Sequence, residues 1–142
     1  MTAAYDPDNV FAKILRGDLP AHRIYEDDHS YAFMDIMPRG EGHCVVIPKA
    51  SACNILDIDP SDLATLIQTV QLIAKAAVKA FDADGVMIEQ FNGAAAGQTV
   101  HHLHFHVIPR FEGVPLKRHV SSMEKPDVLA ASAEKMLGVL GN

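Results

Sequence analysis

The sequence predicts an α+β domain with a largely antiparallel sheet and flanking helices. Short strand-like segments follow one another through tight polar turns in the first 50 residues, which is typical of hairpins rather than of alternating βα units. A long amphipathic helix and a C-terminal helix complete the pattern. The 142 residues, 49% of them hydrophobic, fit a single domain, residues 1–142, with a substantial core.

Five segments have the length and composition of strands. They are rich in apolar residues and are bounded by turn-forming residues. They are Arg23–Glu26, Ser30–Asp35, His43–Pro48, Val86–Phe91 and a histidine-rich segment that runs through Ile108 and is closed by Pro109. The stretch from Met37 to Gly42 contains a proline and two glycines and is expected to be a loop.

Three segments carry helical signals: Asn9–Arg16, about Pro60–Asp82, and Pro126–Leu140. Asp8 or Asn9 can cap the first, and Gly17 ends it. Asp59 is a good N-cap for the longest helix. The apolar stripe of that helix is expected to comprise Leu63, Leu66, Ile67, Val70, Ile73, Ala74, Ala77 and Phe81.

Composition excludes several classes of protein. The formal charge of -6 argues against binding a nucleic acid polymer through its phosphates. Cys44 and Cys53 form no Cys-x-x-Cys pair, so we expect reduced thiols, with one disulfide as the alternative. The N-terminus does not resemble a signal peptide, and no apolar stretch reaches the ~20 residues of a membrane span. We therefore expect a cytoplasmic protein without a membrane partner.

His102, His104 and His106 alternate with apolar residues, which is strand periodicity. All three imidazoles are therefore expected on one face, ~6.6 Å apart along the strand. A metal site is one alternative, with two ligands from His-x-His and a third from His106 or His43. However, the outer two of the three histidines lie ~13 Å apart on a flat strand and do not easily converge on one ion. His22, His29, His101 and His119 are expected to be non-catalytic.

Nucleophilic chemistry fits the pattern better. A neutral imidazole attacks phosphorus well and leaves well, so it can split one transfer into two easier steps. The small-residue loop from Gly93 to Thr99 directly precedes the histidines, and its backbone N–H groups can approach a phosphate closely.

The segment from Gly97 to Arg110 resembles the signature of the histidine triad (HIT) family, His-φ-His-φ-His-φ-φ. Supporting blocks are Val10–Ile14, Ala32–Asp35 and Gly42–Lys49, so the resemblance covers a core of residues 9–112 and leaves a C-terminal extension with the helix at about 126–140. The chain looks like the bacterial Hint/Fhit-like branch. The resemblance implies a HIT-like fold with a five-stranded sheet extended across a homodimer. It also implies no cofactor, a purine nucleotide or nucleoside phosphate substrate, and hydrolysis or transfer at the α-phosphate through a nucleotidyl-histidine intermediate.

The resemblance also implies roles for individual residues. His104 is the nucleophile, the carbonyl of His102 holds one nitrogen of His104, His106 assists the leaving group, and His43 completes the cluster. Asp35 takes the ribose hydroxyls. The remaining substrate-binding candidates are Phe11, Ile14, Phe33 and Ile36 around the base, and Asn92, Gly97, Gln98 and Thr99 near the phosphate.

Two departures from the family pattern matter. Phe91 stands where many members carry an amide that reaches the α-phosphate, and Asn92 beside it is the candidate replacement. Asn9 and Ala12 stand where some bacterial relatives have the cysteines of a structural zinc site, so we predict no zinc there. Three hypotheses follow: a hydrolase of nucleoside phosphoramidates or dinucleoside polyphosphates, a nucleotide-binding regulatory module with little turnover, and a histidine-ligated metalloprotein.

Overall fold

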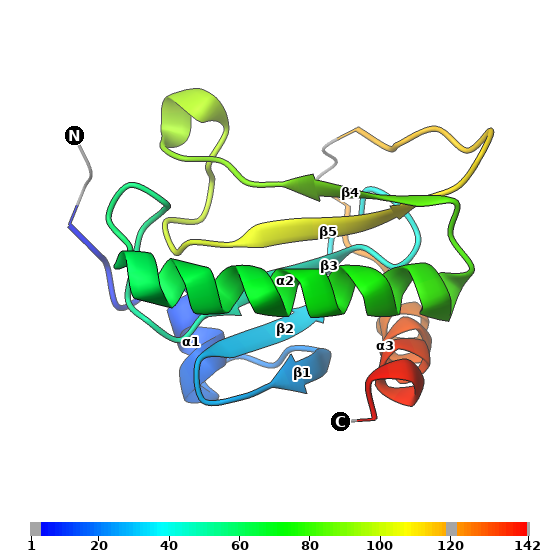
Figure 1. Ribbon diagram of the computed structural model, residues 1–142, viewed down its shortest axis with the longest axis horizontal. Helices are drawn as coiled ribbons and strands as arrows, with labels where there is room; N and C mark the ends of the chain where they lie inside the picture. Colours follow the sequence, from blue (N-terminus) through cyan, green and yellow to red (C-terminus); the bar gives the residue numbers. More distant parts are fainter. Residues whose placement is uncertain (1–3, 119–121, 142) are drawn as a thin grey trace.

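The computed structural model describes residues 4–118 and 122–141, so His119 lies outside the described residues. Its five strands form one sheet in the order β1-β2-β3-β5-β4, with every neighbouring pair antiparallel (Figure 1). The strands are β1 Arg23–Glu26, β2 Ser30–Met34, β3 Cys44–Pro48, β4 Gly85–Glu89 and β5 Phe105–Arg110. The predicted α+β class and antiparallel sheet are confirmed.

The three predicted helices are present: α1 Val10–Arg16, α2 Pro60–Phe81 and α3 Pro126–Leu140. Asn9 caps α1 by accepting a hydrogen bond from Ala12 N at 2.9 Å, and Gly17 ends it with a φ of 82°. Asp59 caps α2 by accepting from Ser61 N at 2.9 Å. A short 3₁₀ helix, η1 (Ala94–Ala96), lies in the loop between β4 and β5.

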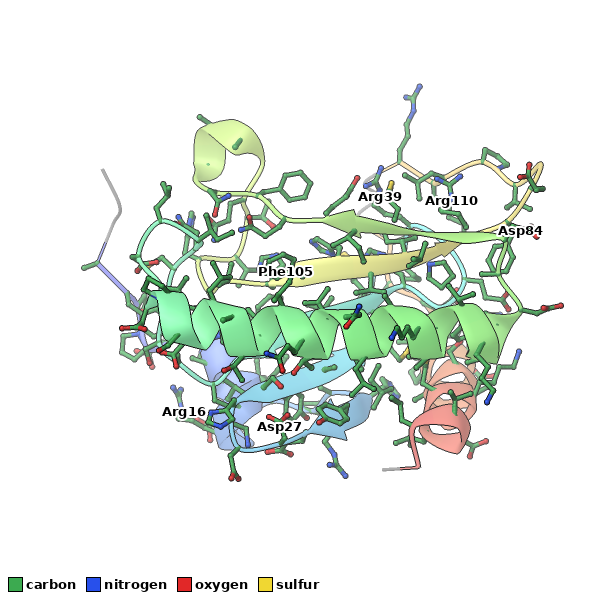
Figure 2. The ribbon with its side chains drawn as sticks, in the orientation of Figure 1. Arg16, Asp27, Arg39, Asp84, Phe105 and Arg110 are labelled. Carbon is green, nitrogen blue, oxygen red and sulfur yellow. The ribbon has the colours of Figure 1, made fainter. Side chains whose placement is uncertain are left out.

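Helix α2 covers one face of the sheet, and the main core lies between them (Figure 1). Leu66, Val70 and Ile73 of α2 share this core with Leu103, Phe105 and Val107 around β5; Phe105 lies between β5 and α2 in Figure 2. The apolar positions of the alternating segment therefore face the helix. The predicted stripe of α2 is wrong at Ile67, which is 45% exposed, because the buried face is centred on the row through Leu66, Val70, Ile73 and Ala77.

By length and composition alone, α2 could cross a membrane, contrary to our expectation that no stretch is long enough. Its buried row packs against the sheet, however, as in the core helix of a globular domain.

A second, smaller apolar cluster comprises Phe33, Val45 and Ile47. Phe11 and Ile14 of helix α1 pack against it. It is separate from the core under α2, because β-strand side chains alternate between the two faces of the sheet.

Several predicted strand boundaries are wrong. Strand β3 begins at Cys44 rather than His43, and β4 begins at Gly85 rather than Val86. Strand β2 ends before Asp35, β4 ends two residues before Phe91, and β5 begins after His104. Residues before β5 contact a loop rather than a strand, since Leu103 N donates to Ala52 O at 2.9 Å. Pro109 does not end β5 but lies within it, opposite Val86 of β4. Its other side lies beyond the residues of β5 that pair with β3, so no backbone N–H is needed there, and proline has none to offer.

Candidate active site

Four histidines approach one another on the face of β5 away from α2. Antiparallel pairing of β3 and β5 sets Val45 opposite His106. His43 lies two residues before Val45, directly before β3, and its side chain is therefore on the same face of the sheet, next to His106. His43, His102 and His104 are buried, and His106 is partly buried. The ring centroids of His104 and His106 are 5.0 Å apart, and those of His43 and His106 are 5.1 Å apart. The structure therefore brings together all four histidines that the sequence predicts to be catalytic.

One ring nitrogen of His104 forms a hydrogen bond with the backbone, and this bond determines which nitrogen carries the proton. Its Nδ1 lies 2.7 Å from the carbonyl oxygen of His102, and a carbonyl can only accept, so Nδ1 carries the proton. The Nε2 of the neutral ring then has a lone pair. Burial lowers the pKa of His104 below its usual value; the hydrogen bond to His102 opposes this, and the charge of His101 reinforces it. His104 is thus a neutral imidazole with a lone pair on Nε2 near neutral pH.

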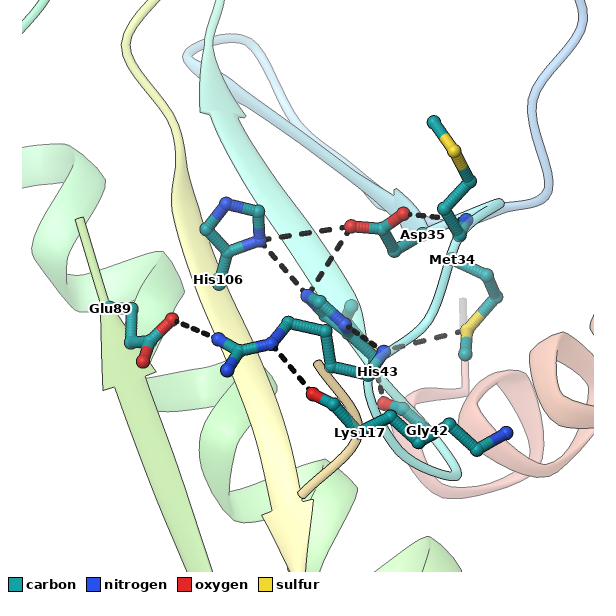
Figure 3. Close-up of polar contacts among 10 residues, drawn as sticks. Met34, Asp35, Gly42, His43, Glu89, His106 and Lys117 are labelled. Atoms are coloured by element: carbon teal, nitrogen blue, oxygen red, sulfur yellow. Dashed lines mark hydrogen bonds and ion pairs between the residues drawn. The ribbon is translucent and has the colours of Figure 1, made fainter. Parts of the chain in front are cut away.

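His43 and His106 are held in the opposite sense. The backbone N–H of Arg39 donates to His43 Nδ1 at 3.0 Å, so the proton of the neutral His43 ring is on Nε2. That Nε2 lies 2.9 Å from His106 Nδ1, which must then accept (Figure 3). The proton of a neutral His106 is consequently on Nε2. The Nε2 of His106 can therefore donate a hydrogen bond, whereas the Nε2 of His104 can only accept one.

The loop that carries the Arg39 N–H is fastened to the sheet. The guanidinium of Arg39 pairs with Glu89 at the end of β4 at 2.9 Å and donates to the Lys117 carbonyl at 3.1 Å (Figure 3). Both side chains of the ion pair are largely shielded from solvent, so this pair is screened less than an exposed one. The pair therefore helps to keep the His43 tautomer fixed.

Asp35 joins the second histidine pair. Its Oδ2 lies 3.3 Å from His43 Nε2 and 3.7 Å from His106 Nδ1, while Oδ1 accepts from Met37 N at 2.8 Å. Asp35 Oδ2 is therefore a second acceptor near the His43 Nε2–H, beside His106 Nδ1. The sequence predicted Asp35 as a ribose ligand, and that role stays a prediction.

Asp35, His43 and His106 also lie close enough together to be considered as metal ligands, with ligand atoms within 4.8 Å of one another. A histidine that binds a metal through Nε2 normally donates its Nδ1–H to a neighbouring acceptor. His43 does the reverse, because its Nδ1 accepts from a backbone N–H and its Nε2 holds the proton. The hydrogen bonds of His43 therefore do not match those of a histidine that binds a metal through Nε2.

The loop before β5 is held by two amides that the sequence assigned to the substrate. The buried Gln98 donates to the carbonyls of Cys53 and Val100 at 2.7 and 2.9 Å and accepts from Gly93 N at 2.8 Å. The Asn92 Oδ1 accepts from Ile55 N at 2.8 Å. Both amides fix the shape of the loop, and their contact with substrate stays a prediction, as does that of the exposed Gly97 and Thr99.

Phe91 places an aromatic ring beside His106. Its centroid is 6.1 Å from that of His106, and its Cδ1 lies 3.6 Å from where a Cβ on Gly97 would stand. The position that many HIT proteins fill with an amide is therefore apolar here. Because β4 ends at Glu89, strand alternation does not govern where Phe91 and Asn92 point.

Three of the four residues predicted to surround the base lie in one apolar cluster, and the fourth does not. Phe11 makes edge contacts with Phe33 and with His104, at centroid distances of 5.4 and 4.9 Å, and Ile14 packs against the same cluster. Ile36 is 41% exposed and is not part of that cluster. Sequence reasoning also missed Tyr5, whose hydroxyl lies 2.7 Å from His102 Nδ1. No periodicity or motif connects residues 97 positions apart.

Several known proteins are similar to this chain in sequence and in structure. A family profile described as HIT domain matches residues 16–113. Adenylylsulfatase HINT3 of Arabidopsis thaliana is 39% identical over 124 residues, covering 83% of this chain and 63% of that protein. Adenosine 5'-monophosphoramidase HNT1 of Saccharomyces cerevisiae is 39% identical over 108 residues, covering 76% and 66%. A crystal structure of a Hit-like protein involved in cell-cycle regulation from Bartonella henselae superposes with a TM-score of 0.90 at 49% identity, covering 96% of this chain and 99% of that one.

Proposed function

The chain belongs to the HIT family, and we propose that it hydrolyses purine nucleoside phosphoramidates or dinucleoside polyphosphates at the α-phosphate. The family relationship, with relatives named as an adenylylsulfatase and an adenosine 5'-monophosphoramidase, supports nucleotide hydrolase activity in general. The observation that carries the finer proposal is the opposite tautomers of His104 and His106, because a nucleophile and an acid on neighbouring rings are what a displacement at phosphorus needs.

In the first step, the lone pair on His104 Nε2 forms a bond to the α-phosphorus. The bond from phosphorus to the leaving nitrogen or oxygen breaks, and the leaving atom keeps that electron pair and takes the Nε2 proton of His106. Loss of this proton leaves one negative charge on the His106 ring, which balances the positive charge on His104. The His43 Nε2–H, which faces His106 Nδ1 at 2.9 Å, stabilises that negative charge. The His102 carbonyl stabilises the positive charge that develops on His104.

In the second step, water resolves the nucleotidyl-histidine. Its oxygen bonds to phosphorus, one of its protons returns to His106 Nε2, and the electron pair of the phosphorus–nitrogen bond returns to His104. The products are the nucleoside monophosphate and the protonated leaving group, and both histidines recover their original tautomers.

Trapping the intermediate tests this function. The protein would be mixed separately with adenosine phosphoramidate and diadenosine polyphosphates, quenched rapidly and digested, and the modified residue located by mass spectrometry. We expect adenylylation on His104. Turnover with the adenylyl group on another residue, or no hydrolysis of either substrate class, would contradict the proposal.

A nucleotide-binding regulatory module is the second candidate function. Phe91 favours it, because an apolar ring beside His106 offers no hydrogen bond to a phosphate oxygen. Such a protein would bind nucleotide in the same site with little turnover.

We also propose a homodimer in the cytoplasm. Strand β4 lies at one edge of the sheet and exposes Val86 and Ile88, so a second copy can extend the sheet there. Light scattering during gel filtration would report a dimer; a monomer at micromolar concentration would refute this assembly.

A further inference from the structure

A contact on the far side of His102 connects the N-terminal segment to the nucleophile. The hydroxyl of Tyr5 lies 2.7 Å from His102 Nδ1, and the two rings meet edge to face at a centroid distance of 5.6 Å. The opposite nitrogen of His102, Nε2, lies 2.8 Å from the carbonyl of Pro48. Because that carbonyl can only accept, Nε2 carries the proton, and Nδ1 of the neutral ring accepts from the Tyr5 O–H.

Burial keeps His102 neutral, since it lowers the pKa of the ring below its usual value. Both nitrogens of this buried ring are therefore satisfied, one by a donor and one by an acceptor. Removing the donor would leave a buried acceptor without its partner, which is costly for the native arrangement. The residue whose carbonyl holds His104 is thus itself held from two sides.

The segment that delivers Tyr5 is tied to helix α1. Asn9, the N-cap of α1, donates from its backbone N and its side chain to the Asp6 carbonyl, at 3.2 and 2.7 Å. Phe11 on the same helix contacts the rings of His102 and His104 at 6.4 and 4.9 Å. The described part of the N-terminal segment, from residue 4 on, consequently covers both histidines with aromatic rings, and within it only Tyr5 supplies a hydrogen bond to them.

We propose that Tyr5 is a positioning residue for the nucleophile: its hydroxyl fixes the ring of His102, and so the His102 carbonyl that fixes the tautomer and direction of His104. This role rests on the proposed hydrolase function but makes a structural claim that can be tested without turnover. Tyr5 touches no reacting atom in this scheme, so its effect should fall on the rate of attack rather than on substrate binding.

The test uses Tyr5→Phe, which removes the hydroxyl and keeps the ring. Tyr25→Phe is the matched control, because the Tyr25 hydroxyl bonds Asp27 at 3.0 Å in the β1–β2 hairpin, away from the histidines. We expect kcat on adenosine phosphoramidate to fall about three- to tenfold in Tyr5→Phe, as for loss of one hydrogen bond, with KM nearly unchanged. Tyr25→Phe should retain the wild-type kcat.

Nitrogen-15 NMR of the imidazoles provides the second readout. In the wild type, His102 should be protonated at Nε2 and accept at Nδ1; in Tyr5→Phe the resonances of His102 and His104 should shift or broaden, while those of His43 stay in place. Unchanged His102 and His104 resonances in Tyr5→Phe would overturn the proposal even if the wild type were inactive on every substrate. A wild-type protein without turnover but with the expected NMR changes would refute only the hydrolase function.

Discussion

The two pairs of histidines in this site use the same side chain in opposite ways. In the His102–His104 pair, main-chain carbonyls accept from the rings, so His104 presents a lone pair at Nε2. In the His43–His106 pair, a main-chain N–H donates to the first ring, so His106 presents an N–H. The backbone groups that meet each pair, rather than the imidazoles themselves, decide which ring presents a lone pair and which presents an N–H, and so which of them the proposed mechanism uses as nucleophile and as acid.

Removing the nucleophile should give the largest effect. In His104→Ala, kcat on adenosine phosphoramidate should fall on the order of 10⁴-fold or more, because no lone pair then faces the phosphorus. Steady-state kinetics beside a circular dichroism spectrum would separate this loss from misfolding. His29→Ala, which removes an exposed imidazole, should keep full activity. Full hydrolysis by His104→Ala would break the assignment of the first pair.

Removing the acid should cost less and should depend on the leaving group. We expect His106→Asn to lose ~10²–10⁴-fold with an alkylamine leaving group, the usual range for general acid catalysis. With a leaving group that departs without a proton, such as a nitrophenolate, the loss should shrink sharply. An equal loss on both substrates would mean that His106 does not act as the proton donor.

The buried pair should also make folding depend on pH. The folded-state pKa values of His102 and His104 are lowered, so the unfolded chain binds more protons below the ordinary histidine pKa of ~6.5. Their contribution to stability is fully present above that value and is lost as the pH falls toward the lowered pKa values. Each histidine should remove up to about 1.4 kcal/mol per pH unit from the free energy of unfolding there.

Urea unfolding at pH 7.5 and pH 5 would measure this loss. Repeating it with His102→Asn, which cannot gain a proton, should give a shallower pH dependence than the wild type. An identical slope in the variant would contradict the assignment of a neutral, buried His102.

Substitution of Phe91 should give the smallest change in activity, and it distinguishes a hydrolase from a nucleotide-binding module with little turnover. Phe91→Asn places an amide beside His106, and one added hydrogen bond to a phosphate oxygen should raise kcat/KM by no more than about tenfold. An increase in kcat/KM of a hundredfold or more would instead favour the hypothesis that the wild-type protein binds nucleotide with little turnover. Gel-filtration behaviour and melting temperature would show that the substitution leaves the fold intact.

Local patterns were enough to predict the elements of this fold and the members of the histidine cluster. Alternation placed Leu103, Phe105 and Val107 in the core, and capping signals at Asn9, Gly17 and Asp59 fixed two helices. The family resemblance supplied the roles. The resemblance also implied the contact of His104 with the His102 carbonyl. Neither could predict the tautomers of His43 and His102, because these depend on backbone groups of Arg39 and Pro48, which are brought to the rings only by the folded chain.

Contacts between distant segments were equally out of reach. Gln98 and Asn92 were predicted at the phosphate from their place in the motif, and folding also gives each amide a protein partner in a distant loop, at Cys53 and Ile55. The contact of Tyr5 with His102 joins two segments that no periodicity relates. Hydrogen bonds between distant segments are the part of the site that a single sequence does not reveal.

The most direct test of the opposed tautomers is nitrogen-15 NMR of the histidine rings in the substrate-free protein at neutral pH. The account predicts that His104 is protonated at Nδ1 and bare at Nε2, whereas His106 is protonated at Nε2 and accepts at Nδ1. A proton on Nε2 of His104, or the same tautomer on both rings, would contradict it.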